Sequence, residues 1–240
     1  MLSFFVLYYI TTMPISVCKS DYFTDRSREV FLSCSPEEGK KQSDGNYYCP
    51  KFIDVFILST TSLEAFINER IAISLEICRR RLELNDPVNK DTLDSDRFHV
   101  KILHRAIRDN LREKYLKIPQ KLWGKTFDKS KSPFHDFESL VEIRNDIIHY
   151  KMPFYEEQNA DPSWANEISI KGLFMSEPVI IPPFSLAEGN QRVWIDEICT
   201  YKAAQWAHNT SCKMIKQFIE MSKGIIRNTT EDYAEYFIEV

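Results

Sequence analysis

Glycine is scarce in this chain, and no glycine-rich phosphate loop is present. Only 6 of the 240 residues are glycine, and none is arranged as G-x-G-x-x-G or G-x-x-x-x-G-K. Those two patterns build the nucleotide-binding loops of Rossmann and P-loop proteins. No alternation of strands and helices accompanies the few glycines either, so both routes to nucleotide chemistry are excluded.

The cysteines show no metal-binding spacing. None of the six forms a C-x-x-C pair, and the five histidines do not complete a zinc-ligand pattern. We therefore predict no metal and no cofactor. The pattern is typical of reduced, buried thiols in a cytoplasmic protein, and a disulfide framework is the alternative. The cysteines are Cys18, Cys34, Cys49, Cys78, Cys199 and Cys212.

Long hydrophobic runs are also missing. The apolar stretch at residues 2–10 is too short to span a bilayer, no basic residue precedes it, and no small-residue cleavage site follows. We interpret it as a buried strand or packed arm, with a signal peptide as the alternative and Met13 as an alternative start. Residues 1–50 are predicted to form an N-terminal arm with a short helix near residues 21–32. No membrane association is predicted.

The charge is weakly negative overall but strongly positive in one segment. The net charge of −4 argues against a surface with a general positive potential. Residues 101–131, however, hold ten Lys or Arg against three Asp or Glu, which is a local balance of +7. The rest of the chain is correspondingly acidic.

Apolar residues recur at helical spacing in four long segments. The patterns predict helices over residues 52–84, 96–118 (closed by Pro119), from Ser132-Pro133 to about Lys151, and 193–223. Residues 152–190 hold five of the 11 prolines, and two short strand-like stretches there predict a β-hairpin. The expected fold is an all-α bundle of about four helices over residues 51–240, with a Pro-rich insertion at residues 152–190 before the last long helix.

Three polar residues stand together near the end of the third predicted helix. Asn145 and His149 are four residues apart and share a helix face, while the long side chain of Arg144 reaches the same edge. Histidine titrates near neutrality and can move the proton of an RNA 2′-hydroxyl. Arginine stabilises the charge that develops on the phosphorane, and asparagine holds the phosphate or orients the imidazole. This set suits metal-independent RNA cleavage to a 2′,3′-cyclic phosphate and a 5′-hydroxyl.

The segment Arg-Asn-x-x-x-His resembles the HEPN superfamily, whose ribonucleases carry an R-x4–6-H motif with a polar residue directly after the Arg. Residues 62–69 also resemble an early helix of its bacterial members, and the resemblance covers roughly residues 52–223. It implies a homodimer in which both copies of Arg144 and His149 line one cleft. It also implies a toxin or phage-defence effector with RNA as substrate, and an antitoxin or defence protein as a further partner. The alternative it implies is an inactive dimeric module that binds a nucleotide or a partner.

The motif has competing interpretations. A second match pairs Arg97 with His104, six residues between them. We favour Arg144 because an asparagine follows it on a well-opened helix downstream of the long helix. In the structural alternative, His149 only caps a helix and Arg144 pairs with Glu142 or Asp146.

Two further sets of residues are candidates for supporting roles. The basic stripe on the second predicted helix either follows an RNA backbone or forms a solvated face. Glu64 and Asn68, four apart on the first predicted helix, either support the cleft or belong to an exposed polar stripe. His135 and His208 are expected to be packed or surface residues. The basic stripe consists of Lys101, Arg105, Arg108 and Arg112.

Overall fold

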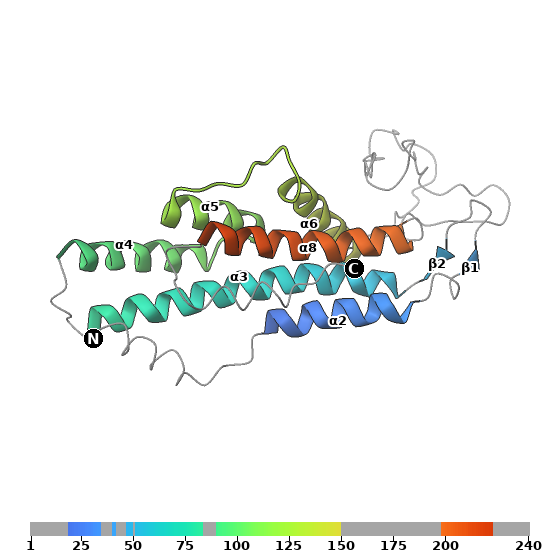
Figure 1. Ribbon diagram of the computed structural model, residues 1–240, viewed down its shortest axis with the longest axis horizontal. Coiled ribbons are helices and arrows are strands. Elements are labelled where there is room, and N and C mark those ends of the chain that lie inside the picture. Colours follow the sequence, from blue (N-terminus) through green and yellow to red (C-terminus); the bar gives the residue numbers. More distant parts are fainter. Residues whose placement is uncertain are drawn as a thin grey trace, which may run out of the picture. The chain divides into compact units, whose positions relative to one another are not determined.

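The computed structural model describes residues 19–34, 40–41, 47–49, 51–83, 90–149 and 198–222, and this part of the chain is mainly helical, which confirms the all-α fold. A two-residue antiparallel ladder between β1 (Lys40–Lys41) and β2 (Tyr47–Tyr48) accompanies the helices. The predicted arm at residues 2–10 and the insertion at residues 152–190 lie outside the described residues. The helices are α2 (Lys19–Ser33), α3 (Phe52–Glu83), α4 (Lys90–Ala106), α5 (Leu111–Trp123), α6 (Phe134–Ile148) and α8 (Tyr201–Ser222) (Figure 1).

The described residues divide into two compact units. Unit 1 contains residues 19–23, 61–83, 90–127 and 217–222, and unit 2 contains residues 24–34, 40–41, 47–49, 51–60, 128–149 and 198–216. Helices α2, α3 and α8 contribute residues to both units. The predicted domain division at residue 50 stays a prediction.

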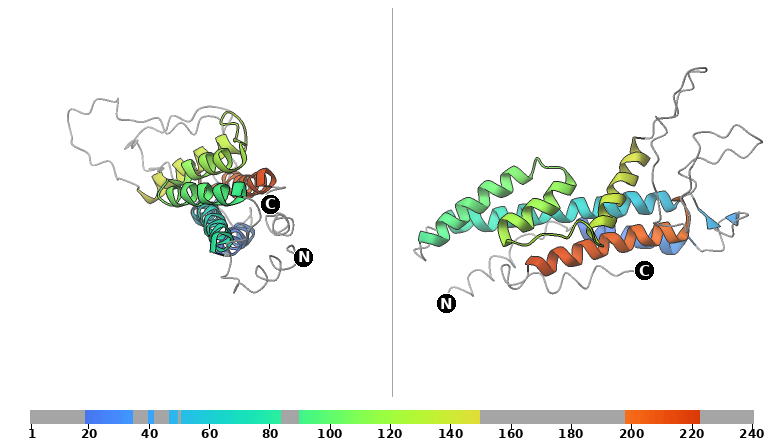
Figure 2. Two further views of the ribbon diagram at one scale, coloured as in Figure 1. Left: turned by 90° about the vertical axis from the view of Figure 1, so that its left-hand side faces the viewer. Right: turned by 90° about the horizontal axis from the view of Figure 1, so that it is seen from above.

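Unit 1 is built around aromatic rings. In α3, Leu63, Phe66 and Ile67 recur at three- and four-residue steps and are fully buried. The ring of Phe218 packs edge-on against both Phe66 and Tyr115, with centroids 5.6 Å apart in each case. The Tyr115 hydroxyl donates a hydrogen bond to the Leu63 carbonyl at 3.0 Å, which satisfies the polar atom of a wholly buried side chain. Helix α4 lies alongside the C-terminal half of α3 (Figures 1 and 2).

Unit 2 has an apolar cluster and a buried polar network. Phe31, Phe52 and Tyr201 pack together, with ring centroids 4.6 to 6.4 Å apart. Next to this cluster, α2 and the start of α3 run antiparallel (Figures 1 and 2). Their Ser27 and Ser59 hydroxyls lie 3.0 Å apart. The Nδ1 atom of His208 on α8 lies 3.2 Å from the Ser27 hydroxyl, so this histidine is a packed residue.

The described cysteines match the expectation of free thiols. Four of the five are buried and Cys49 is half-buried. The Cys34 and Cys49 sulfurs lie 3.4 Å apart. Burial, and then the neighbouring Cys49, raise the pKa of the Cys34 thiol to about 11.

The predicted helix over residues 96–118 is wrong in its extent, because two helices occupy this region. Helix α4 ends at Ala106, and the Asn110 side chain then accepts a hydrogen bond from the Glu113 N–H at 2.9 Å, which starts α5. Ile107, inside the predicted helix, stands in the intervening turn and is 51% exposed.

The expected end of that helix at Pro119 is also wrong, since Pro119 lies inside α5. The helix instead ends at Trp123, and its C-cap residue Gly124 has a positive φ of 65°, which suits a left-handed closing turn. Its N–H donates to the Gln120 carbonyl, and the Lys125 N–H donates to the Pro119 carbonyl.

Two further helix starts differ from prediction. The helix predicted from Ser132-Pro133 begins at Phe134, with Pro133 as the N-cap of α6, and the Ser132 hydroxyl donates to the Asp136 carboxylate at 2.6 Å. Helix α8 begins at Tyr201, where the Thr200 hydroxyl oxygen accepts a hydrogen bond from the Ala203 N–H at 3.2 Å, and the preceding Cys199 carbonyl accepts one from the Cys49 N–H. Among the described residues, no helix combines the length and apolarity needed to cross a membrane.

Candidate active site at the end of helix α6

Helix α6 carries the predicted catalytic residues at its C-terminal end. Phe134, Phe137, Leu140 and Ile143 recur at three- and four-residue steps and are buried. Burial of this stripe fixes the rotation of α6 within unit 2. Asn145, on the other side of the helix, is exposed.

The three predicted catalytic residues lie within two turns of helix. Nη1 of Arg144 donates to Oδ1 of Asn145 at 3.0 Å, and His149 is the C-cap residue, whose N–H donates to the Asn145 carbonyl at 2.8 Å. Asn145 and His149 are exposed, whereas Arg144 is half-buried. The structure thus places an amide and an imidazole in solvent, with a guanidinium held beside the amide.

The structural alternative was that His149 caps the helix and that Arg144 forms an ion pair with Glu142 or Asp146, and only its first part is supported. His149 does cap the helix through its backbone. Within the part of the chain that is described, however, no ion pair joins Arg144 to Glu142 or Asp146, and the buried Nε of Arg144 has no hydrogen-bond partner. Desolvation raises the pKa of Asp146, so this carboxylate is less well solvated than its exposed position on the helix suggests.

The basic stripe is divided by the break between α4 and α5. Lys101 and Arg105 lie on α4, Arg108 lies in the turn, and Arg112 lies on α5. The prediction of one stripe on a single helix is therefore wrong, because the Asn110 cap starts a new helix. All four side chains are exposed, and their role in RNA binding stays a prediction.

Glu64 and Asn68 are exposed on α3, and Nζ of Lys114 on α5 donates to Oδ1 of Asn68 at 2.8 Å. This contact was not predicted, because it joins residues 46 positions apart. Both residues belong to unit 1, whereas Arg144 belongs to unit 2. Their proposed support of the catalytic cleft stays a prediction.

The second motif match lies wholly on α4. Arg97 and His104 are both exposed, and Nη1 of Arg97 lies 3.5 Å from Oδ1 of Asp94. His135, at the start of α6, is also exposed, and its Nδ1 lies 3.8 Å from an Asp136 oxygen. It provides a surface histidine on the same helix as His149 but outside the motif.

The structure also brings together three residues that were not singled out in the sequence. Cys78 on α3 meets Asp96 and His99 on α4, with one potential ligand atom from each within 4.8 Å of the others. Asp96 and His99 have an i, i+3 spacing that places them on one helix face, and this weak signal was available in the sequence. Cys78 lies on another helix, and its sequence distance from Asp96 and His99 does not indicate that the three residues meet. Burial, and then the Asp96 charge, raise the pKa of Cys78 to about 11.

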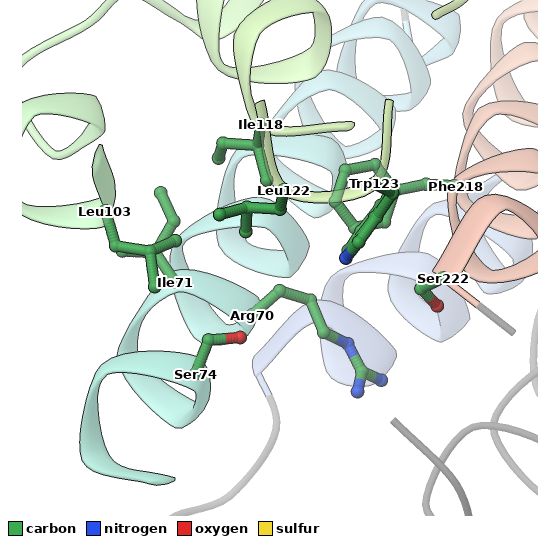
Figure 3. Close-up of a pocket in the computed structure, with 9 residues that line it drawn as sticks. All are labelled: Arg70, Ile71, Ser74, Leu103, Ile118, Leu122, Trp123, Phe218 and Ser222. Atoms are coloured by element: carbon green, nitrogen blue, oxygen red, sulfur yellow. The ribbon is translucent and has the colours of Figure 1, made fainter. Parts of the chain in front are cut away.

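A small hollow in unit 1 is lined mainly by apolar side chains, including Ile71, Leu103 and Trp123 (Figure 3). Arg70 contributes its aliphatic stem, and its guanidinium lies over the Phe66 ring, 5.1 Å from the centroid. None of the predicted site residues lines this hollow. It offers no set of convergent polar groups for a ligand.

Comparisons of this chain with models of known protein families, with curated proteins and with solved structures find no match. The resemblance to the HEPN superfamily therefore depends on the motif and the helical pattern, and membership stays a prediction.

Proposed function

We propose that this protein is a metal-independent RNA endonuclease of the HEPN type, whose catalytic residues are Arg144, Asn145 and His149. The observation that carries the proposal is the grouping of these side chains at the end of α6, where Asn145 and His149 are exposed. A phosphodiester can reach such a site directly from solvent. The proposal includes a toxin or antiviral defence role in the cytoplasm.

Each residue has a distinct chemical role in this proposal. The His149 imidazole removes the proton from the RNA 2′-hydroxyl as its oxygen attacks phosphorus. The Arg144 guanidinium stabilises the negative charge that gathers on the phosphorane oxygens. Asn145 already accepts a hydrogen bond from Arg144, so it holds the guanidinium in place while its amide N–H remains available to a phosphate oxygen.

The chemistry favours a dimer. The 5′-oxygen leaves on the side of phosphorus opposite the attacking oxygen, so a base and an acid are needed on two sides. One protomer supplies one His149, and a second copy related by a two-fold axis supplies the other.

The decisive experiment incubates the purified full chain with total RNA and with tRNA in EDTA. Wild type should cleave, and His149→Ala and Arg144→Ala should not, although all three fold. His135→Ala is the matched control, because it removes an exposed histidine of the same helix outside the motif. Full activity in His149→Ala would refute the site. Binding of RNA without cleavage by wild type would identify the inactive binding module instead.

A further inference from the structure

A second polar cluster lies in unit 1, where the C-terminal part of α3 runs alongside α4 (Figures 1 and 2). Cys78 of α3 and Asp96 and His99 of α4 each place one sulfur, oxygen or nitrogen atom within 4.8 Å of the other two. The i, i+3 spacing of Asp96 and His99 directs both side chains to the same side of α4. Two neighbouring helices therefore bring three different donor atoms close together.

The carboxylate in this cluster is buried, and only part of its hydrogen-bonding capacity is used. Asp96 is only 3% exposed, and its Oδ2 atom has no hydrogen-bond partner. Among the described residues, its cationic partner is Arg81, whose Nη1 lies 3.6 Å from the other oxygen, Oδ1, and whose side chain is half exposed. A buried carboxylate with an unsatisfied oxygen is strongly disfavoured unless a charged partner completes it.

We propose that Cys78, Asp96 and His99 bind a divalent transition-metal ion, with zinc as the best fit and water as the fourth ligand. Thiolate, imidazole and carboxylate are the three ligand types that zinc takes in proteins. In a tetrahedral zinc site, neighbouring ligand atoms lie about 3.5 Å apart, as follows from bonds of about 2.0 to 2.3 Å. Binding therefore requires side-chain rotations that bring these atoms from within 4.8 Å of one another to that spacing.

The donor set also indicates which ions are excluded. Calcium and magnesium prefer sets made of oxygen atoms, and a thiolate and an imidazole suit neither. On binding, the Cys78 thiol loses its proton to solvent, so thiolate and carboxylate together balance the charge of the dication. The metal then links α3 to α4 and gives the Asp96 carboxylate a charged partner.

Cobalt(II) is the probe for this site, because a thiolate bound to it gives a charge-transfer band in the near ultraviolet. The full chain is stripped with a chelator, freed of it, and titrated with Co²⁺ and then Zn²⁺. We expect one equivalent of Co²⁺ per chain, a thiolate band, and loss of that band when Zn²⁺ displaces cobalt. Cys78→Ser should abolish the band, and His99→Ala should weaken binding at least about tenfold.

Cys49→Ser is the matched control, because Cys49 is a half-buried thiol in unit 2, outside the proposed site and 3.4 Å from the Cys34 sulfur. It should leave the cobalt signal unchanged. If Cys78→Ser does not fold, His99→Ala carries the test, since His99 is only half-buried. Absence of stoichiometric Co²⁺ binding to folded wild type, or an unchanged band in Cys78→Ser, would overturn the proposal. The readout is independent of RNA cleavage, so either proposal can fail alone.

Discussion

The end of α6 and the paired stretch of α3 and α4 hold two polar clusters with opposite properties. The first comprises Arg144, Asn145 and His149, which are close in sequence and have two exposed members. The second comprises Cys78, Asp96 and His99, which come from two helices and include a carboxylate that is 3% exposed. A local cluster can be identified from spacing on one helix, whereas a cluster built across helices becomes visible only when their pairing is known.

The two clusters also differ in what their burial requires. The exposed side chains of Asn145 and His149 stay hydrated at little energetic cost, although the buried Nε of the half-buried Arg144 has no hydrogen-bond partner. A buried, unsatisfied carboxylate oxygen costs on the order of 1–3 kcal/mol or more. The unsatisfied buried carboxylate of the α3–α4 cluster therefore indicates a bound ligand. The α6 cluster instead indicates a function because its residue types are suited to RNA cleavage.

The largest expected effect comes from the α6 cluster. Replacing His149 with Ala should lower the rate of RNA cleavage by roughly 10²- to 10⁴-fold, because the general base is lost. The measurement is the initial rate on a labelled RNA in EDTA, with circular dichroism to confirm folding. A rate equal to that of His135→Ala would place the chemistry elsewhere.

A finer change in the same cluster tests the role of the guanidinium. Arg144→Lys keeps the positive charge but loses the planar fork that contacts both Asn145 and a phosphate, so we expect a loss of roughly tenfold or more in cleavage rate. Single-turnover rates at saturating RNA should show the loss. If Lys supports the wild-type rate, Arg144 acts only as a point charge.

Zinc should affect stability through the α3–α4 cluster only. At a free concentration 100 times its dissociation constant, zinc should raise the free energy of unfolding by about 2.7 kcal/mol, which is a shift of about 5–10 °C in Tm for a chain of this size. Thermal unfolding with and without zinc measures it. Asp96→Asn should remove the shift, and a shift that survives this change would indicate a different binding site.

Cys34 is, like Asp96, a buried titratable residue, but no ligand is proposed for it. Its pKa of about 11, against an ordinary 9.0, means that the folded state keeps a proton that the unfolded state loses. This contribution to the free energy of unfolding is fully present below about pH 9 and is lost as the pH rises towards about 11. Urea unfolding at pH 8 and pH 10.5 should show a smaller alkaline loss in Cys34→Ala. An equal loss in both proteins would contradict the raised pKa.

The smallest expected effect tests the break that separates α4 from α5. Asn110→Ala should cost about 1 kcal/mol, because the Glu113 N–H loses its side-chain acceptor. Urea unfolding of the variant beside wild type measures it. An unchanged stability would show that the side chain does not determine where α5 begins.

Helix patterns in the sequence predicted α3 and the apolar face of α6, because long periodic segments packed on one side need no knowledge of their partners. The break at Asn110 was missed, since apolar periodicity runs through residues 103–118 without interruption and a single capping residue decides the boundary. The end predicted at Pro119 was wrong because α5 continues past this proline to Trp123. Both errors concern helix boundaries, which the hydrophobic pattern does not determine.

The candidate site was predictable to the extent that it is local. Arg144, Asn145 and His149 lie within six residues, so a helix alone brings them together. The contact of Lys114 with Asn68 and the meeting of Cys78 with Asp96 depend instead on how α3 pairs with α4 and α5. Spacing within one helix carries no information about that pairing.

Analysis of the RNA ends tests the central claim most directly. RNA cut by wild type in EDTA should carry 5′-hydroxyl ends that a polynucleotide kinase labels without prior phosphatase treatment, and 3′ ends that resist labelling until the cyclic phosphate is removed. These ends follow from attack by the neighbouring 2′-hydroxyl under His149 and Arg144. Ends bearing a 5′-phosphate and a 3′-hydroxyl, or intact RNA after incubation with folded wild type, would contradict the account.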